Sequence, residues 1–208
     1  MKKNLAIKAL FVDIGGVLLT DGWPIASRKQ AAKKFGLDWN EMEVRHHLTF
    51  DTYEQGKLDL NEYLSRVVFY KQRSFTRAQF REFMFAQSRP FPQMIELVRG
   101  LKQKYGLKII VVSNEARELN TYRIRTFKLD KFVDAFVSSC FVHLRKPDLD
   151  IFRLALDISQ TPARQIVYIE NTAMFVKLAE GLGINCILHE DYKSTLSQLG
   201  AYGFSSAP

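Results

Sequence analysis

Short runs of β-branched and aromatic residues recur along the chain, and segments in which apolar residues return every three or four positions lie between them. The pattern predicts strands over residues 7–12, 108–112, 132–138, 165–169 and 185–188. Parallel strands need a crossover connection, usually a helix, so this alternation is typical of a parallel sheet with helices on both faces. We therefore expect an α/β fold: a Rossmann-like, doubly wound parallel sheet.

The interval between the first two predicted strands, residues 21–90, is far longer than one crossover helix requires. It contains the spacing of a helix-starting capping box at Asp59–Glu62 and again at Thr76–Gln79. We interpret it as three or four amphipathic helices that form a small lobe around an aromatic core. The expected division is an α/β domain of residues 1–20 and 91–208, with this helical lobe inserted after the first strand.

Length and composition narrow the class of protein. With 208 residues, 47% hydrophobic and 25% charged, the chain has the balance of an ordinary globular protein. Cys140 and Cys186 are too few for a disulfide framework, and Lys8 and Asp13 interrupt the apolar run after Met1–Lys3 that a signal peptide would need. No apolar stretch approaches the roughly 20 residues that span a bilayer. We expect a cytoplasmic protein without a membrane partner.

The chain carries a formal charge of +8, from 30 Lys and Arg against 22 Asp and Glu. These basic residues are scattered over several segments and form no stripe or tail of the kind that follows a nucleic-acid backbone. We therefore predict no nucleic-acid partner and interpret most of the excess as solvated helix faces. A basic surround that attracts small anionic substrates is the alternative.

Side chains suited to chemistry follow the predicted strands at the points where the strands end. In an open parallel sheet these ends share one edge, so the side chains there meet in one crevice. An aspartate can attack phosphorus, while a hydroxyl, backbone amides and an ammonium hold the phosphate oxygens. A divalent cation between two carboxylates would screen the nucleophile from its anionic substrate. The residues at this edge suit phosphoryl transfer: Asp13, Gly15 and Gly16 after the first strand, Ser113 and Asn114 after the second, Lys146 in the loop after the third, and Glu170 and Asn171 after the fourth.

In this order, these motifs resemble those of the haloacid dehalogenase-like (HAD) hydrolase superfamily. The likeness rests on residues 11–18, 112–114, 145–152 and 169–184, and so extends over nearly the whole chain. The helical lobe is inserted where the helical-cap branch of that superfamily carries its cap domain, and residues 54–58 match a turn that often precedes a cap helix. Within that branch the nearest likeness is to sugar-phosphate phosphatases of the glucose-1-phosphatase type.

The resemblance implies a phosphoric monoester phosphatase that acts on a small phosphorylated metabolite of the sugar-phosphate class. It makes Asp13 the nucleophile, which forms an aspartyl-phosphate, and Lys146 the second catalytic residue. Ser113, Asn114 and Gly16 are the implied substrate contacts, with Ser113 and Lys146 holding the phosphate oxygens and Asn114 offering an amide.

The implied cofactor is Mg²⁺, held by Asp13, the Gly15 carbonyl, Glu170 and Asn171. Two positions depart from the family pattern. Gly15 stands where many family phosphatases carry a second aspartate as general acid and base, so no side chain at this position can protonate the leaving oxygen. Asn171 stands where a second acid is usual, and a neutral amide oxygen is expected to bind the hard Mg²⁺ ion more weakly than a carboxylate does.

These departures leave two other functions open. One is a catalytically impaired relative that keeps the fold to bind a ligand or a protein, since Gly15 and Asn171 replace the usual acids. The other is a metal-independent dehalogenase, which also uses an aspartate nucleophile. It is less favoured, because residues 172–175 lack the Ser, Asn and Asp pattern that the resemblance leads us to expect. The sequence predicts no oligomeric state.

Overall fold

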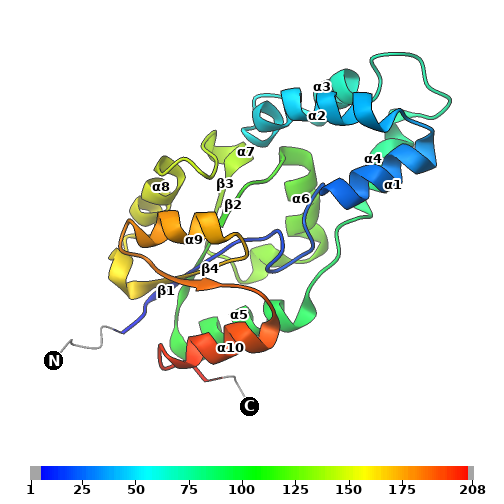
Figure 1. Cartoon of the computed structure of the whole chain (residues 1–208). Helices are drawn as coiled ribbons and strands as arrows, with labels where there is room; N and C mark the ends of the chain where they lie inside the picture. The colour runs from blue at the N-terminus through cyan, green and yellow to red at the C-terminus, as the bar shows by residue number, and fades with distance from the viewer. Residues whose placement is uncertain (1–5, 206–208) are drawn as a thin grey trace.

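The computed structural model describes residues 6–205, so Met1–Lys3, considered above as the start of a signal peptide, lies outside the described part. Within it, five parallel strands form one sheet in the order β3-β2-β1-β4-β5 (Figure 1). This confirms the predicted α/β fold with its Rossmann-like parallel sheet. The strands are β1 (Ala9–Val12), β2 (Lys108–Ser113), β3 (Ala135–Ser138), β4 (Ile166–Glu170) and β5 (Asn185–Leu188).

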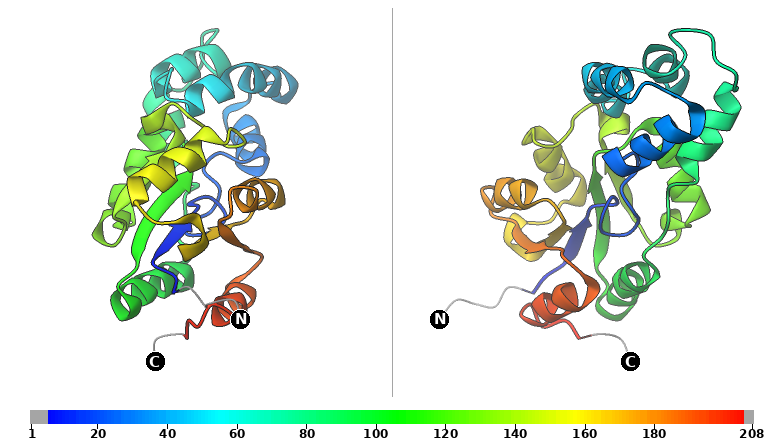
Figure 2. Two further views of the ribbon diagram at one scale, coloured as in Figure 1. Left: turned by 90° about the vertical axis from the view of Figure 1, so that its left-hand side faces the viewer. Right: turned by 45° about the vertical axis from the view of Figure 1, so that its right-hand side comes forward.

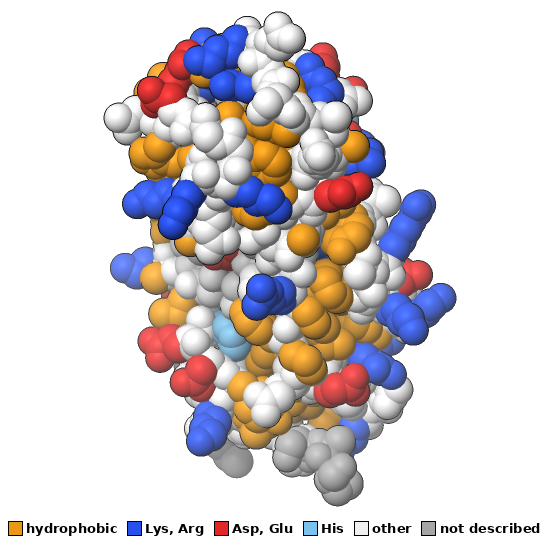
Figure 3. Space-filling model, turned by 90° about the vertical axis from the view of Figure 1, so that its right-hand side faces the viewer, with side chains coloured by type: hydrophobic (Ala, Val, Ile, Leu, Met, Phe, Trp, Pro, Cys, Tyr) orange, Lys and Arg blue, Asp and Glu red, His pale blue; other side chains and the backbone are white. Residues whose placement is uncertain are grey.

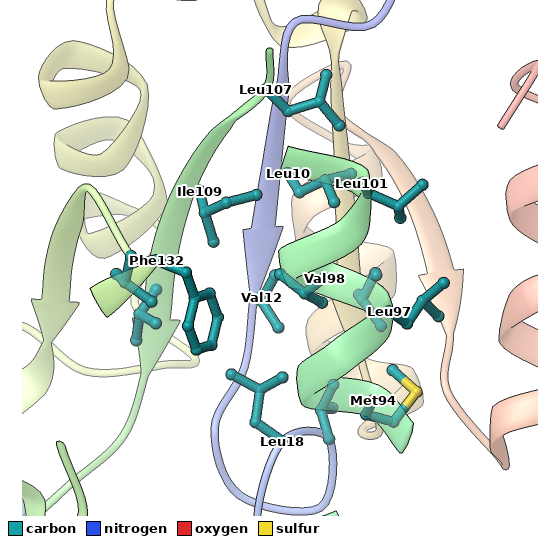
Figure 4. Packing of buried hydrophobic residues seen from close by; sticks show 14 of the residues in the cluster. Leu10, Val12, Leu18, Met94, Leu97, Val98, Leu101, Leu107, Ile109 and Phe132 are labelled. Carbon is teal, nitrogen blue, oxygen red and sulfur yellow. The ribbon is translucent and has the colours of Figure 1, made fainter. Parts of the chain in front are cut away.

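Helices cover both faces of the sheet (Figure 2), and the strands are buried between them. Successive side chains of a strand point to opposite faces, which divides the core into two hydrophobic clusters. Leu10 and Val12 of β1 belong to one cluster, where they pack with the apolar side of α5 (Figure 4), and Phe11 belongs to the other. The first cluster lies under α5 (Pro92–Tyr105) and α10 (Tyr192–Gly200), and the second under α8 (Asp150–Ser159) and α9 (Ala173–Glu180).

Two strands are shorter than predicted, since β1 begins at Ala9 and not at residue 7, and β3 begins at Ala135 and not at residue 132. Phe132 and Val133 are buried in the core as loop residues, and the Asp134 carboxylate accepts a hydrogen bond from the Ile109 N–H (2.8 Å). Their apolar character therefore serves packing rather than strand pairing. The remaining elements of the sheet domain are α6 (Arg117–Thr126), the short 3₁₀ helices η1 (Leu129–Lys131) and η2 (Ala163–Gln165), and α7 (Ser139–Val142).

Four further helices lie apart from the sheet, at the upper right of Figure 1. Both predicted capping boxes are formed, Asp59–Glu62 at the start of α3 and Thr76–Gln79 at the start of α4. The four helices share a hydrophobic cluster of their own, which also takes in Leu119 of α6. We call residues 21–90 the cap, and its exact boundaries stay a prediction. Its helices are α1 (Ile25–Phe35), α2 (Trp39–Glu54), α3 (Leu60–Val67) and α4 (Arg77–Phe85).

Lys and Arg side chains are dispersed among acidic and hydrophobic ones on the face shown in Figure 3. This dispersal fits the interpretation of the excess positive charge as solvated surface. Among the described residues, no helix combines the length and the apolar character that crossing a membrane requires.

Candidate active site

A cavity of about 440 Å³ lies between the carboxyl ends of β1, β2 and β4 and the cap. Two of the predicted site residues do not line it: Glu170 is fully buried, and Gly16 faces a neighbouring hollow beside Met94 and His189. The parallel topology brings the other predicted residues together there, namely Asp13, Gly15, Ser113, Asn114, Lys146 and Asn171.

Asp13 follows β1 directly, and the loop after it fixes its carboxylate. The Asp13 Oδ1 accepts a hydrogen bond from the Ile14 N–H (2.8 Å), and its Oδ2 lies 3.0 Å from the Lys146 Nζ. The loop turns back on itself at Gly16, whose φ of 73° is a conformation that favours glycine. The Gly16 N–H then donates to the Leu19 carbonyl (2.8 Å). This tight loop holds the Asp13 carboxylate at the floor of the cavity.

Lys146 is almost completely buried and bonded on several sides. Its Nζ lies 3.0 Å from the Asp13 Oδ2 and 2.6 Å from the Glu170 Oε2, and it donates to the Tyr168 hydroxyl (3.1 Å). Burial disfavours the charged form, but the carboxylates of Asp13 and Glu170 outweigh it and hold the pKa of Lys146 above its ordinary value. The floor of the cavity therefore carries a fixed ammonium beside the Asp13 carboxylate.

Glu170 ends β4, and both of its carboxylate oxygens are bonded to protein donors. Its Oε2 accepts from Lys146 and from the Tyr168 hydroxyl, and its Oε1 accepts from the Thr172 N–H (2.9 Å). Burial, followed by the Asp13 charge, raises the pKa of Glu170, while Lys146 pulls it down. In this position Glu170 anchors the Lys146 ammonium. Its role as a metal ligand stays a prediction, and it would need a bridging water or the exchange of one of these bonds.

Ser113 and Asn114 end β2, and their side chains do different things. The Ser113 Oγ lies on the cavity lining and donates a long hydrogen bond to Glu115 Oε1 (3.4 Å). The Asn114 carboxamide bonds to the Lys146 backbone: its Nδ2 donates to the Lys146 carbonyl and its Oδ1 accepts from the Lys146 N–H, both at 2.8 Å. Asn114 thus ties two loops of the floor together, and its contact with the substrate stays a prediction.

Oxygen donors for a cation come from the part of the lining formed by Asp13, Gly15 and Asn171. The Asn171 carboxamide packs so closely on Gly16 that a Cβ there would lie 1.9 Å from the Asn171 Nδ2. Carboxylate, backbone carbonyl and amide oxygens are ligands that Mg²⁺ accepts, so the set fits this ion. Among residues 6–205 no group of three or more His, Cys, Asp or Glu side chains has the arrangement of a metal site.

Three acids on the cavity lining, Asp21, Glu54 and Glu115, were not predicted as site residues. Burial, followed by the Asp13 charge, raises the pKa of Asp21, while Arg123 lowers it. Burial raises the pKa of Glu115 to about 7 even though the Arg123 Nη1 lies 2.9 Å from its Oε1. The one sequence signal for Asp21 is its position beside Gly22 in the segment that leaves the first motif.

The cap closes the cavity with a largely apolar wall. Of the polar side chains that the cap brings there, Arg28 bonds to Glu43 and the Trp23 carbonyl, and Glu54 bonds to Arg145. The Asp21 carboxylate and the buried Tyr53 hydroxyl have no hydrogen-bond partner among the described residues. The cavity therefore has a charged floor and an apolar wall. The wall residues are Trp23, Pro24, Ile25, Phe50 and Met84.

These features define an α/β enzyme whose active site lies between a sheet domain and a cap. They are the parallel sheet, the Asp13–Lys146 pair at its carboxyl edge and the cap across the cavity. Residues 7–183 match the family model of the haloacid dehalogenase-like hydrolases. The chain belongs to this family.

Individual relatives agree with this assignment. The chain is 26% identical over 196 residues to the sesquiterpene phosphatase astK of Aspergillus oryzae, covering 92% of this chain and 94% of that protein. A HAD family enzyme from Bacteroides thetaiotaomicron, in complex with magnesium and inorganic phosphate, superposes with a TM-score of 0.74 at 19% identity, over 91% of this chain and 99% of that one. The L-2-haloacid dehalogenase from Xanthobacter autotrophicus, with chloropropionic acid covalently bound, gives a TM-score of 0.61 at 15% identity, over 97% of this chain and 85% of that one. These two structures share the fold of this chain.

Proposed function

We propose that this chain is a phosphatase that hydrolyses the phosphoric monoester of a small metabolite, with Asp13 as the nucleophile. The observation that carries the proposal is the Asp13 carboxylate held 3.0 Å from the buried Lys146 ammonium at the floor of the cavity. A carboxylate in this position can attack an anionic phosphorus centre, because the ammonium offsets the charge of the phosphate oxygens. The similarity over almost the whole chain to a protein named as a sesquiterpene phosphatase supports the proposal.

The reaction has two steps. Lys146 and the Ser113 hydroxyl hold the phosphate oxygens, with the Asn114 backbone N–H beside them. An Asp13 carboxylate oxygen attacks phosphorus, the bond from phosphorus to the leaving oxygen breaks, and an aspartyl-phosphate forms. Water then attacks this phosphorus and releases inorganic phosphate and free Asp13.

The cofactor in this proposal is Mg²⁺. Asp13, the Gly15 carbonyl and the Asn171 amide would hold it, and when bound it supplies positive charge that screens the nucleophile from the substrate. The HAD family enzyme of Bacteroides thetaiotaomicron, whose complex contains magnesium and inorganic phosphate, supports this choice.

The apolar wall favours a substrate whose leaving group has an apolar portion. The hydroxyls of a sugar would be buried against Trp23, Phe50 and Met84, and each hydroxyl left without a partner costs about 1–3 kcal/mol. An alkyl or isoprenoid group gains about 25 cal/mol for each Å² that it buries there. The sugar-phosphate class expected from the sequence stays a prediction and is the alternative.

The test compares three substrates, p-nitrophenyl phosphate, an isoprenyl phosphate and a hexose phosphate, with Mg²⁺ and with a chelator. Asp13→Asn should lower turnover by about a thousandfold or more, because the nucleophile is lost. The matched control is Asp157→Asn, the same change on the exposed side of α8, and it should leave turnover unchanged.

Three results would contradict parts of the proposal. Turnover that survives Asp13→Asn would show that Asp13 is not the nucleophile. A chain that binds phosphate compounds and turns over none of them would favour the catalytically impaired relative. A higher kcat/KM for the hexose phosphate than for the isoprenyl phosphate would reject the apolar leaving group and restore the sugar-phosphate class.

A further inference from the structure

Gly15 leaves a space beside the nucleophile, and the side chain of Asp21 fills it. A Cβ built on Gly15 would lie 3.3 Å from the Asp21 Oδ1 and 3.7 Å from the Asp21 Cα. The Asp21 carboxylate therefore stands where a side chain of residue 15 would project. Asp13, Gly15 and Asp21 line the same cavity. A residue eight positions after the nucleophile thus brings a carboxylate to the place that the sequence leaves empty.

The segment that carries Asp21 is fixed by the sheet domain. The Arg123 Nη2 of α6 donates to the Thr20 carbonyl, and the Arg123 side chain is itself fully buried and paired with Glu115. A Cβ on Gly22 would lie 2.9 Å from the Arg123 Nη1, so the chain passes this guanidinium in close contact. The backbone therefore contacts the Arg123 guanidinium on both sides of Asp21, through a hydrogen bond at Thr20 and by close packing at Gly22.

The other acids on the cavity lining are already engaged. Both oxygens of Glu115 accept from the Arg123 Nη1 (2.9 and 3.1 Å). The Glu54 Oε2 accepts from the Arg145 Nη2 (2.7 Å). Within residues 6–205, by contrast, no hydrogen bond or ion pair engages the Asp21 carboxylate, and it faces the cavity. Among these three acids, Asp21 is the one free to exchange a proton with a bound molecule.

We propose that Asp21 is the general acid and base of the reaction, in the place of the side chain that Gly15 lacks. The assignment rests on the phosphatase function proposed above. In the first step an Asp13 oxygen bonds to phosphorus, and the bond from phosphorus to the leaving oxygen breaks. The leaving oxygen takes the proton of the Asp21 carboxylic acid, which gives an alcohol and the Asp21 carboxylate. In the second step water attacks the phosphorus, its proton passes to the Asp21 carboxylate, and the bond from phosphorus to Asp13 breaks. Inorganic phosphate leaves, and both aspartates return to their starting states.

The decisive measurement is the dependence of the Asp21→Asn effect on the leaving group. An alkoxide leaves poorly without a proton, whereas p-nitrophenolate leaves well without one. Asp21→Asn should therefore lower kcat/KM, which reports the step that releases the leaving group, by about a hundredfold or more for an isoprenyl phosphate and by about tenfold or less for p-nitrophenyl phosphate. Asp157→Asn is the matched control and should change neither rate.

A carboxylate exchange between the two positions gives a second, independent test. Gly15→Asp combined with Asp21→Ala puts the acid back on residue 15 and removes the side chain that obstructs it. The kcat/KM of this double variant for the isoprenyl phosphate should be at least about tenfold higher than that of Asp21→Ala alone. The melting temperature of each variant is measured alongside, so that a folding defect is recognised.

The wild-type chain offers a test that needs no variant of Asp21. Across a series of substituted phenyl phosphates, kcat/KM should vary weakly with the acidity of the phenol, because protonation by Asp21 removes the charge from the leaving oxygen. A steep dependence overturns the assignment, as does an equal loss on both substrates or no loss in Asp21→Asn. Turnover that survives Asp13→Asn, or its complete absence from the wild-type chain, overturns the proposed function and this assignment with it. If Asp21→Asn lowers kcat/KM equally for both substrates while Asp13 is still essential, only the role of Asp21 is overturned.

Discussion

Replacing Gly56 by alanine measures how tightly the cap is seated on the sheet domain. Gly56 lies in the turn after α2 and has a φ of 67°. A Cβ there would lie 2.2 Å from the carbonyl oxygen of Cys140 in α7, and real Cβ contacts essentially never fall below 3.0 Å. The obstructing atom belongs to the backbone, so no side chain can rotate away, and the turn or α7 must move by about 0.8 Å.

That movement acts on the hydrogen bonds that join the two parts. The Ser139 Oγ donates to the Glu54 carbonyl (2.7 Å), and the His143 Nδ1 lies 2.6 Å from the Gln55 carbonyl oxygen. Alanine in the left-handed region costs about 1 kcal/mol, and overpacking of this kind costs about 1–3 kcal/mol more. Gly56→Ala should therefore lower the free energy of unfolding by about 2–4 kcal/mol.

Gly36→Ala is the matched control, because Gly36 has a similar φ of 60° and nothing within 4 Å of the position of a Cβ. It carries the backbone cost alone, about 1 kcal/mol. Urea denaturation followed by circular dichroism gives both free energies, and thermal unfolding gives a second measure, since 1 kcal/mol shifts Tm by about 2–4 °C in a chain of this size. Equal destabilisation by the two variants would refute the close contact between this turn and α7.

Three more changes test other contacts of the structure. Gly16→Ala should destabilise the fold by only about 1 kcal/mol, like Gly36→Ala, because the obstructing atom is the end of the Asn171 side chain, which can rotate away. Since this displaces a proposed Mg²⁺ ligand, half-maximal activity should need more Mg²⁺, and an unchanged Mg²⁺ titration would argue against a ligand role of Asn171. Lys146→Met should lower kcat for p-nitrophenyl phosphate by about a hundredfold or more, because the ammonium that offsets the phosphate charge is lost. A loss of only a few fold would reject this role. Burial and then the Arg28 charge lower the pKa of His46 from 6.5 to about 3. The imidazole therefore takes up a proton less readily in the folded chain than in the unfolded chain, and the folded state loses stability as the pH falls below about 6.5. His46→Gln should accordingly lose less stability than the wild-type chain between pH about 7.5 and pH about 4.5 in urea denaturation, and parallel losses would show that His46 does not carry this pH dependence.

The sheet and the residues that meet at its carboxyl edge could be predicted because both depend on short-range patterns. Each strand is a short apolar run that ends at a polar residue, and parallel strands place those ends on one edge whatever their order. Asp13, Ser113 and Lys146 therefore line one cavity as expected. The start of β3 was misjudged because Phe132 and Val133 are as apolar as strand residues but pack into the core from a loop.

The contacts of each side chain within the site could not be predicted in the same way. Asn114 and Glu170 were expected to meet the substrate and the metal, yet their polar side-chain atoms bond to Lys146 and its neighbours. Which atom a side chain meets depends on loop conformations that tertiary packing sets, and the spacing along the chain carries no information about it. The place of Asp21 depends in the same way on Arg123, which holds the preceding carbonyl from far along the sequence.

The charged floor and the apolar wall of the cavity are encoded in separate stretches of the chain. Asp13 and Lys146 come from the loops at the sheet edge, whereas Phe50 and Met84 come from the inserted helices. In the proposed reaction, a substitution at Phe50 or Met84 would alter which organic group fits without touching the atoms that break the bond. Substrate preference would then be free to drift during evolution, or be changed by design, while the proposed chemistry at Asp13 stays constant.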